Sequence, residues 1–161
     1  LSRPGSRFAG LAMTIDVLFG DAADMEDHDA ADAGALGLYY VAQACPEDGE
    51  YDICGHFLCI VDVPANLATI RDNLTDAASI QAAAVTAPHE IIHAVQFALQ
   101  TGGRTPIQVF DEDGEDAFFE LARRRRDDAG SEDEAERLAR ASTDHLSTHR
   151  LEALLRKTVD S

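Results

Sequence analysis

The chain has 161 residues, of which 45% are hydrophobic, so it is long and apolar enough for one domain with a buried core. Thirty acidic residues against 13 basic ones give a formal net charge of -17. A surface with this charge repels phosphate, which argues against nucleic acids and anionic membranes as partners. A basic protein is the kind of partner that it would favour.

The cysteine count and the apolar runs bear on the cellular compartment. Cys45, Cys54 and Cys59 leave one thiol unpaired in any disulfide scheme, which favours a reducing compartment, and we expect the cytoplasm. No apolar run approaches the roughly 20 residues that cross a bilayer. The run 8–19 follows two arginines as a signal peptide would, but Asp16 interrupts it and no small-residue cleavage site follows. We therefore interpret it as a core strand.

The first part of the chain predicts strands. Segments 8–19, 36–44 and 56–63 are rich in β-branched and aromatic residues. The turn-forming stretch 46–50 separates the last two, which predicts a hairpin. The acidic segment 21–32 lacks the glycine and the terminal glutamate of an EF-hand calcium loop, so we interpret it as a solvated loop.

Cysteines and a histidine cluster around this hairpin. Cys45, Cys54, His56 and Cys59 would suggest a zinc ribbon, but the paired Cys-x-x-Cys knuckles of such sites are absent. Buried or incidental thiols are the simpler interpretation.

The second part predicts helices from Asn66 onward. Proline is tolerated in the first turn of a helix and costs about 3 kcal/mol inside one, so Pro88 predicts a new helix there. We expect a first helix capped by Thr75 or Asp76 and a second one that starts at 86–88 and ends before Gly102. A further helix should start near Gly114. The capping box Ser131-x-x-Glu134 should open a last helix that runs towards Val159.

Strands followed by helices predict an α+β fold in a single domain, 1–161, strand-rich over 8–63 and helical over 66–159. We expect a small, mostly antiparallel N-terminal sheet, an active-site helix and C-terminal helices.

The strongest chemical signal is the motif His89-Glu90-x-x-His93. Residues four apart lie on one face of a helix, so both imidazoles can reach one Zn²⁺ ion. Glu90 is offset by one residue and can touch a metal-bound water without ligating the metal. Zinc lowers the pKa of that water to about 7, and the carboxylate can then accept its proton. The alternative is two core histidines bonded to backbone carbonyls, with Glu90 in an ordinary ion pair.

Catalytic zinc needs a third protein ligand. On a helix that starts near Gly114, Glu115 shares a face with Phe118 and Phe119, and this apolar face should point towards the metal-binding helix. We therefore predict Glu115 as the third ligand and Glu112 as the next candidate. The alternative role of Glu115 is that of a helix-start acid favoured by the helix dipole.

His89-Glu90-x-x-His93, followed about two dozen residues later by a glutamate that opens a second helix, resembles the gluzincin branch of zincin metallopeptidases in compact form. The resemblance covers roughly 55–125. It implies that His89 and His93 are zinc ligands, Glu90 the general base and Glu115 the third ligand. It also implies a sheet whose edge strand holds an extended peptide. Pro88 departs from the pattern, because peptidase helices usually continue for several residues before the motif.

Other polar residues have simpler interpretations. Gln96 could bond near the site, but its position fits a helix-surface glutamine. His145 and His149 are four apart in a polar region, which favours a solvated face over a second metal site or a transition-state donor. Tyr39 and Tyr40 are alternative donors to an oxyanion. The run Arg123–Arg126 is interpreted as a solvated helix end.

Three hypotheses follow. The first is a zinc-dependent hydrolase, a metallopeptidase that acts on a peptide or protein substrate with Glu90 as general base. The second is a catalytically inactive zincin-like module, stabilised by metal, that docks a basic partner on its acidic surface. In the third, the motif is accidental and no metal binds.

Overall fold

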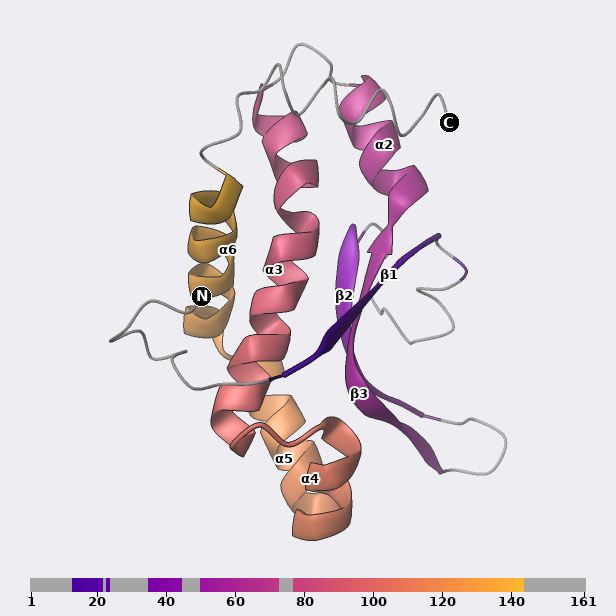
Figure 1. Cartoon of the computed structure of the whole chain (residues 1–161), viewed down its shortest axis with the longest axis vertical. Coiled ribbons are helices and arrows are strands. Elements are labelled where there is room, and N and C mark those ends of the chain that lie inside the picture. Colours follow the sequence, from indigo (N-terminus) through magenta and orange to yellow (C-terminus); the bar gives the residue numbers. More distant parts are fainter. Residues whose placement is uncertain (1–12, 22, 24–34, 45–49, 73–76, 144–161) are drawn as a thin grey trace.

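A computed structural model describes residues 13–21, 23, 35–44, 50–72 and 77–143. Within these described residues the strands β1 to β3 precede the helices α2 to α6, which confirms the α+β class (Figure 1). The elements are β1 (Ile15–Gly20), β2 (Gly37–Ala44), β3 (Tyr51–Asp62), α2 (Val63–Asp72), α3 (Ala77–Thr101), α4 (Pro106–Asp113), α5 (Glu115–Arg126) and α6 (Ala129–Thr143).

The sheet has the strand order β1-β3-β2. β2 and β3 pair antiparallel, which confirms the predicted hairpin, with Tyr39 opposite Cys59. β1 pairs with β3 in parallel, so the sheet is mixed, with one pair of each kind. β2 is an edge strand, and its first residue, Gly37, lies where the sheet meets α3.

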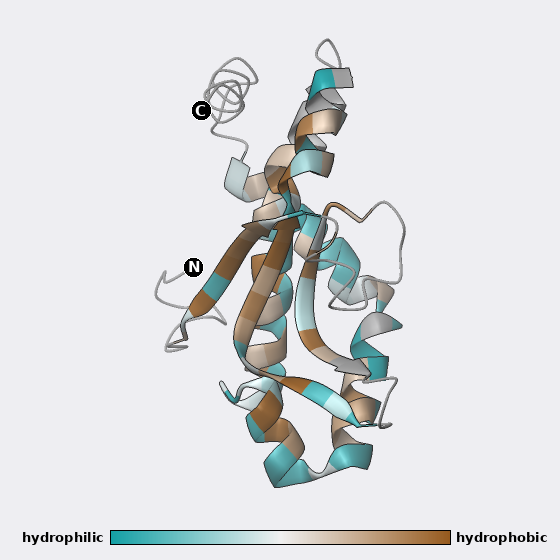
Figure 2. Ribbon diagram, turned by 90° about the vertical axis from the view of Figure 1, so that its right-hand side faces the viewer, coloured by the Kyte–Doolittle hydropathy of each residue, from teal (hydrophilic) through white to brown (hydrophobic). Residues whose placement is uncertain are grey.

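Helix α3 is the central element. It packs against β2 and β3 on one side and against α6 on the other, while α4 and α5 lie at one end of the molecule (Figure 1). The main core forms where α3 meets the sheet and α4–α5, and Phe97 and Phe118 are fully buried in it. Hydrophobic colour runs along most of β1 and β3, whereas the outer helices are mixed (Figure 2).

The prediction that Pro88 starts a new helix is wrong. α3 is one helix of 25 residues with Pro88 inside it, and it ends at Thr101, before Gly102 as predicted. Proline costs a helix one backbone hydrogen bond. Packing of α3 on both of its sides offsets that cost.

Two other boundaries differ from the prediction. The short helix α4 was not expected, and α6 begins at Ala129, ahead of the proposed cap Ser131, which is buried instead. α5 starts at Glu115, next to the predicted Gly114. Several features of the sequence lie outside the described residues: Cys45, Thr75, Asp76, His145, His149 and most of the acidic segment 21–32.

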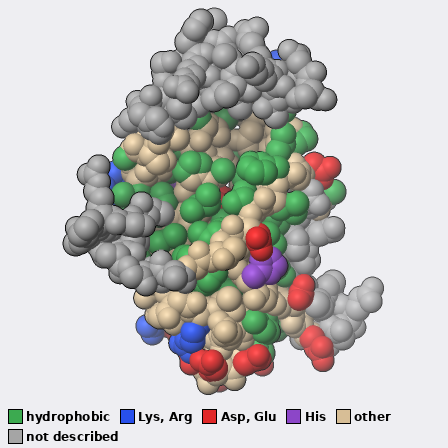
Figure 3. Space-filling view, in the orientation of Figure 1, with side chains coloured by type: hydrophobic (Ala, Val, Ile, Leu, Met, Phe, Trp, Pro, Cys, Tyr) green, Lys and Arg blue, Asp and Glu red, His purple; other side chains and the backbone are tan. Residues whose placement is uncertain are grey.

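Charged side chains gather at the end of the molecule where α4 and α5 lie, while hydrophobic side chains crowd the centre of the same face (Figure 3). None of the helices in the described part of the chain combines the length and the apolar character that a bilayer crossing requires.

Candidate metal centre

The motif of α3 presents its side chains to two neighbours. Successive residues of a helix are turned by about 100°, so His89 and Glu90 cannot share a direction. His89 and His93 contact α6, whereas Glu90 is buried against β2. α3 thus places the two imidazoles at one interface and the carboxylate at the other.

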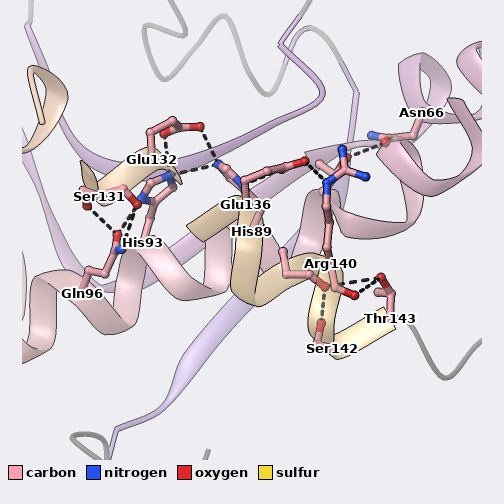
Figure 4. Close-up of polar contacts among 12 residues, drawn as sticks. Asn66, His89, His93, Gln96, Ser131, Glu132, Glu136, Arg140, Ser142 and Thr143 are labelled. Carbon is pink, nitrogen blue, oxygen red and sulfur yellow. Dashed lines mark hydrogen bonds and ion pairs between the residues drawn. The ribbon is translucent and has the colours of Figure 1, made fainter. Parts of the chain in front are cut away.

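Three potential ligand atoms converge between α3 and α6 (Figure 4). The Nε2 atoms of His89 and His93 are 3.0 Å apart. Glu132 of α6 faces both, with Oε1 2.9 Å from His89 Nε2 and Oε2 3.0 Å from His93 Nε2. Among the described residues, this is the group of His, Cys, Asp and Glu side chains whose ligand atoms all lie within 4.8 Å of one another.

The spacing of these atoms fits a small divalent ion. Ligands at about 2.0–2.1 Å from a tetrahedral zinc lie about 3.3 Å from one another. The two imidazole nitrogens are 3.0 Å apart, and each lies 2.9–3.0 Å from a different carboxylate oxygen of Glu132, so these separations come within a few tenths of an ångström of that value. Two imidazoles and one carboxylate form a donor set that suits zinc and leaves a position open.

Each histidine has a second partner at its other ring nitrogen. His93 Nδ1 lies 2.9 Å from the amide oxygen of Gln96, and His89 Nδ1 lies 3.5 Å from a carboxylate oxygen of Glu136. Histidines that bind metals usually donate their remaining N–H to such a group, which fixes the ring and its tautomer. Both Nε2 atoms are therefore turned towards Glu132.

The electrostatics of the group favour a cation. Burial, followed by the neighbouring His89, lowers the pKa of His93, so protonation of that ring is disfavoured. Glu132 faces both rings and Glu136 faces His89. A metal ion supplies positive charge to these carboxylates without protonating the imidazoles.

Glu90 lies in a different environment. Glu90 is 9% exposed, and burial raises its pKa to about 8; the charge of Glu132 raises the pKa further, and a hydrogen bond from the backbone of Tyr39 lowers it. Glu90 and His89 nevertheless line one pocket of about 220 Å³, together with Gly37, Thr86 and Glu136.

The predicted third ligand is not brought to the histidines. Glu115 is exposed at the start of α5 and is not part of the convergent group, and Glu112 pairs with Arg104 at 3.0 Å. The apolar face of α5 does point inward, since Phe118 is fully buried, but it packs in the main core. The signal for Glu132 was its spacing of four from Glu136, which matches His89 and His93 on the facing helix.

The prediction that Gln96 lies on the helix surface is wrong, because Gln96 is only 5% exposed and contacts His93. Tyr39 belongs to the main core, and Tyr40 donates its hydroxyl hydrogen to Asp52.

The cysteines and arginines complete the set of predicted residues. Cys54 and Cys59 are buried free thiols, whereas His56 is half exposed and lies 3.6 Å from Asp16. Arg123 and Arg124 pair with Glu120, as expected of a solvated helix end. Arg125 differs from them, because its guanidinium donates to the backbone carbonyl of His93 at 3.0 Å.

Comparisons with protein-family models, curated proteins and solved structures found no match to this chain. The functional argument therefore depends on the arrangement of the residues themselves.

Proposed function

We propose that this chain binds one zinc ion through His89, His93 and Glu132 and hydrolyses peptide bonds with Glu90 as general base. The observation that carries the proposal is the convergence of three ligand atoms from two helices. In addition, the other ring nitrogen of each imidazole lies near a second polar group. The zincin resemblance of the motif agrees with it. The third ligand differs from the Glu115 expected from sequence.

Zinc in this donor set would act as a Lewis acid towards a carbonyl group and would make water a better nucleophile. The protein contributes the geometry. His89 and His93 orient their Nε2 lone pairs, and Glu132 adds negative charge on the opposite side. Its carboxylate is 64% exposed, which keeps the centre open to water and substrate.

Glu90 is suited to proton transfer. It lines the same pocket as His89, and burial raises its pKa to about 8 without metal, so the group can bind and release a proton in the range just above neutral pH. In the proposed reaction it accepts a proton from the attacking water and then delivers that proton to the leaving amine. Proton transfer by a placed carboxylate typically contributes about 10²–10⁴-fold to the rate.

The metal assignment is tested by the zinc content of the purified protein. We expect one zinc per wild-type chain, and loss or sharp weakening of binding in His93→Ala and Glu132→Ala. Glu115→Ala is the matched control, because it removes the carboxylate predicted from sequence and should keep its zinc. Zinc kept in Glu132→Ala and lost in Glu115→Ala would show that Glu115 is the third ligand. Wild-type protein without zinc would refute the proposal.

The catalytic assignment is tested with Glu90→Gln on a library of quenched fluorescent peptides. We expect zinc to be retained and turnover to fall by about 10²–10⁴-fold. Zinc binding without turnover in the wild type would favour the rival function, a metal-stabilised module that docks a basic partner on its acidic surface. Unchanged turnover in Glu90→Gln would show that Glu90 is not the base.

A further inference from the structure

Gln96 makes a full set of hydrogen bonds at the interface of α3 and α6 (Figure 4). Its Oε1 lies 2.9 Å from His93 Nδ1 and 2.8 Å from Ser131 Oγ. Its Nε2 lies 3.0 Å from the backbone carbonyl of Ser131 and 2.9 Å from Glu134 Oε2. A primary amide has two donor hydrogens and one oxygen with two lone pairs, so this amide is saturated.

The direction of these bonds follows from the partners. A backbone carbonyl and an ionised carboxylate only accept hydrogen bonds, so the NH₂ group of Gln96 must face Ser131 O and Glu134. The amide oxygen must then face His93, and an oxygen only accepts. His93 Nδ1 is therefore the donor, which sets the neutral ring as the Nδ1–H tautomer.

This tautomer leaves the lone pair of His93 on Nε2, the atom that lies 3.0 Å from both His89 Nε2 and Glu132 Oε2. We propose that Gln96 is a positioning residue that holds His93 in its metal-binding tautomer. The metal-binding role of this tautomer rests on the proposed function, whereas the tautomer itself is a property of the metal-free protein.

The same amide also positions the other side of the centre. Ser131 and Glu134 flank Glu132 on α6, so the bonds from Gln96 set both the ring of His93 and the helix segment that carries the third ligand. The contact behind His89 is weaker, because Glu136 is 40% exposed and 3.5 Å away. Of the two residues that contact the outer ring nitrogens of His89 and His93, Gln96 is therefore the buried one.

The test is the tautomer of His93 in metal-free protein, read from ring nitrogen shifts by ¹⁵N NMR at pH 8. The signal is assigned by its loss in His93→Gln. We expect Nδ1–H in wild type. In Gln96→Met, which has no acceptor at this position, we expect the Nε2–H form to appear. Gln100→Met, at an exposed glutamine one turn further along α3, is the matched control and should resemble wild type.

A second readout is zinc affinity by chelator competition. Outer partners of ligating histidines typically change metal affinity by about 10–100-fold, and we expect a loss of this size in Gln96→Met and none in Gln100→Met. A wild-type Nε2–H tautomer, or one unchanged in Gln96→Met, would overturn the inference. If no variant and no wild-type protein binds zinc, the proposed function fails, while the NMR result still decides the role of Gln96.

Discussion

At the scale of single residues, His89 and Glu90 are adjacent in the sequence but lie in different environments, because successive residues of a helix point in different directions. His89 reaches the α3–α6 interface and Glu132, whereas Glu90 is buried where Gly37 of β2 approaches α3. Burial disfavours the charged form of an acid, and the nearby carboxylate of Glu132 adds to the effect. This environment makes Glu90 a carboxyl group that titrates near neutral pH.

The raised pKa of Glu90 predicts a pH-dependent stability of the metal-free protein. Because the folded-state pKa is about 8 and the ordinary value is 4.5, the folded chain binds the proton more tightly than the unfolded chain. The contribution is therefore fully present below about pH 4.5 and is lost as pH rises through about 8. We expect Glu90→Gln, which is permanently neutral, to gain on the order of a few kcal/mol relative to wild type between pH 5 and pH 9.

Urea unfolding with chelator present measures this difference at pH 5, 7 and 9. Comparing the two proteins at each pH cancels the other titrating groups, His93 included. A constant difference between wild type and Glu90→Gln over this range would contradict the buried, proton-binding carboxyl group.

The ligating histidines were predictable from sequence, and the third ligand was not. Spacing along one helix is a local property, so His89 and His93 follow from the period of the helix. Glu132 lies about 40 residues later, and its place depends on how α6 packs on α3. Gln96 was missed for the same reason, since its burial is created by Ser131 and Glu134 of α6.

At the scale of helices and strands, local patterns gave the hairpin of β2 and β3, because strand pattern and turn residues lie close together in the chain. They did not give the parallel pairing of β1 with β3, which joins distant segments. They also failed at Pro88, where tertiary packing on both sides of α3 overrides a local helix-breaking preference.

The contact of β2 with α3 depends on a glycine. A Cβ atom on Gly37 would lie 2.7 Å from Thr86 Cγ2 and 2.9 Å from Glu90 Cγ, which is closer than packed carbon atoms approach. We expect Gly37→Ala to destabilise the protein by about 1–3 kcal/mol, as overpacking does, and to displace the Glu90 side chain. Thermal unfolding with and without zinc measures the first effect, and peptide turnover measures the second.

Gly55→Ala is the matched control for this substitution. Gly55 also lies in a strand, but a Cβ atom there has nothing within 4 Å, so the change should leave stability and turnover close to wild type. Equal effects of the two substitutions would show that β2 does not approach α3 as closely as described.

At the scale of the whole molecule, α6 packs on α3 through an apolar contact and through a set of polar contacts. Its buried alanines, Ala135 and Ala139, pack on Val85 and Ile92 of α3. Alanine side chains allow close approach but bury little apolar area. The polar contact consists of Glu132 facing the histidines and the bonds of Gln96 to Ser131, so metal binding should stabilise the docking of α6.

Removal of the metal should therefore loosen α6 more than the sheet. A ligand present at a thousand times its Kd stabilises the folded state by about 4 kcal/mol, which for a domain of this size is on the order of 10 °C in Tm. We expect chelator to lower the Tm of wild type and Glu115→Ala by this order, and to leave Glu132→Ala unchanged. Hydrogen exchange should rise in α6 and stay slow in β3, because the core around Cys59 and Phe97 does not involve the metal. Equal loss of protection in both elements would mean that the metal stabilises the whole domain rather than the docking of one helix.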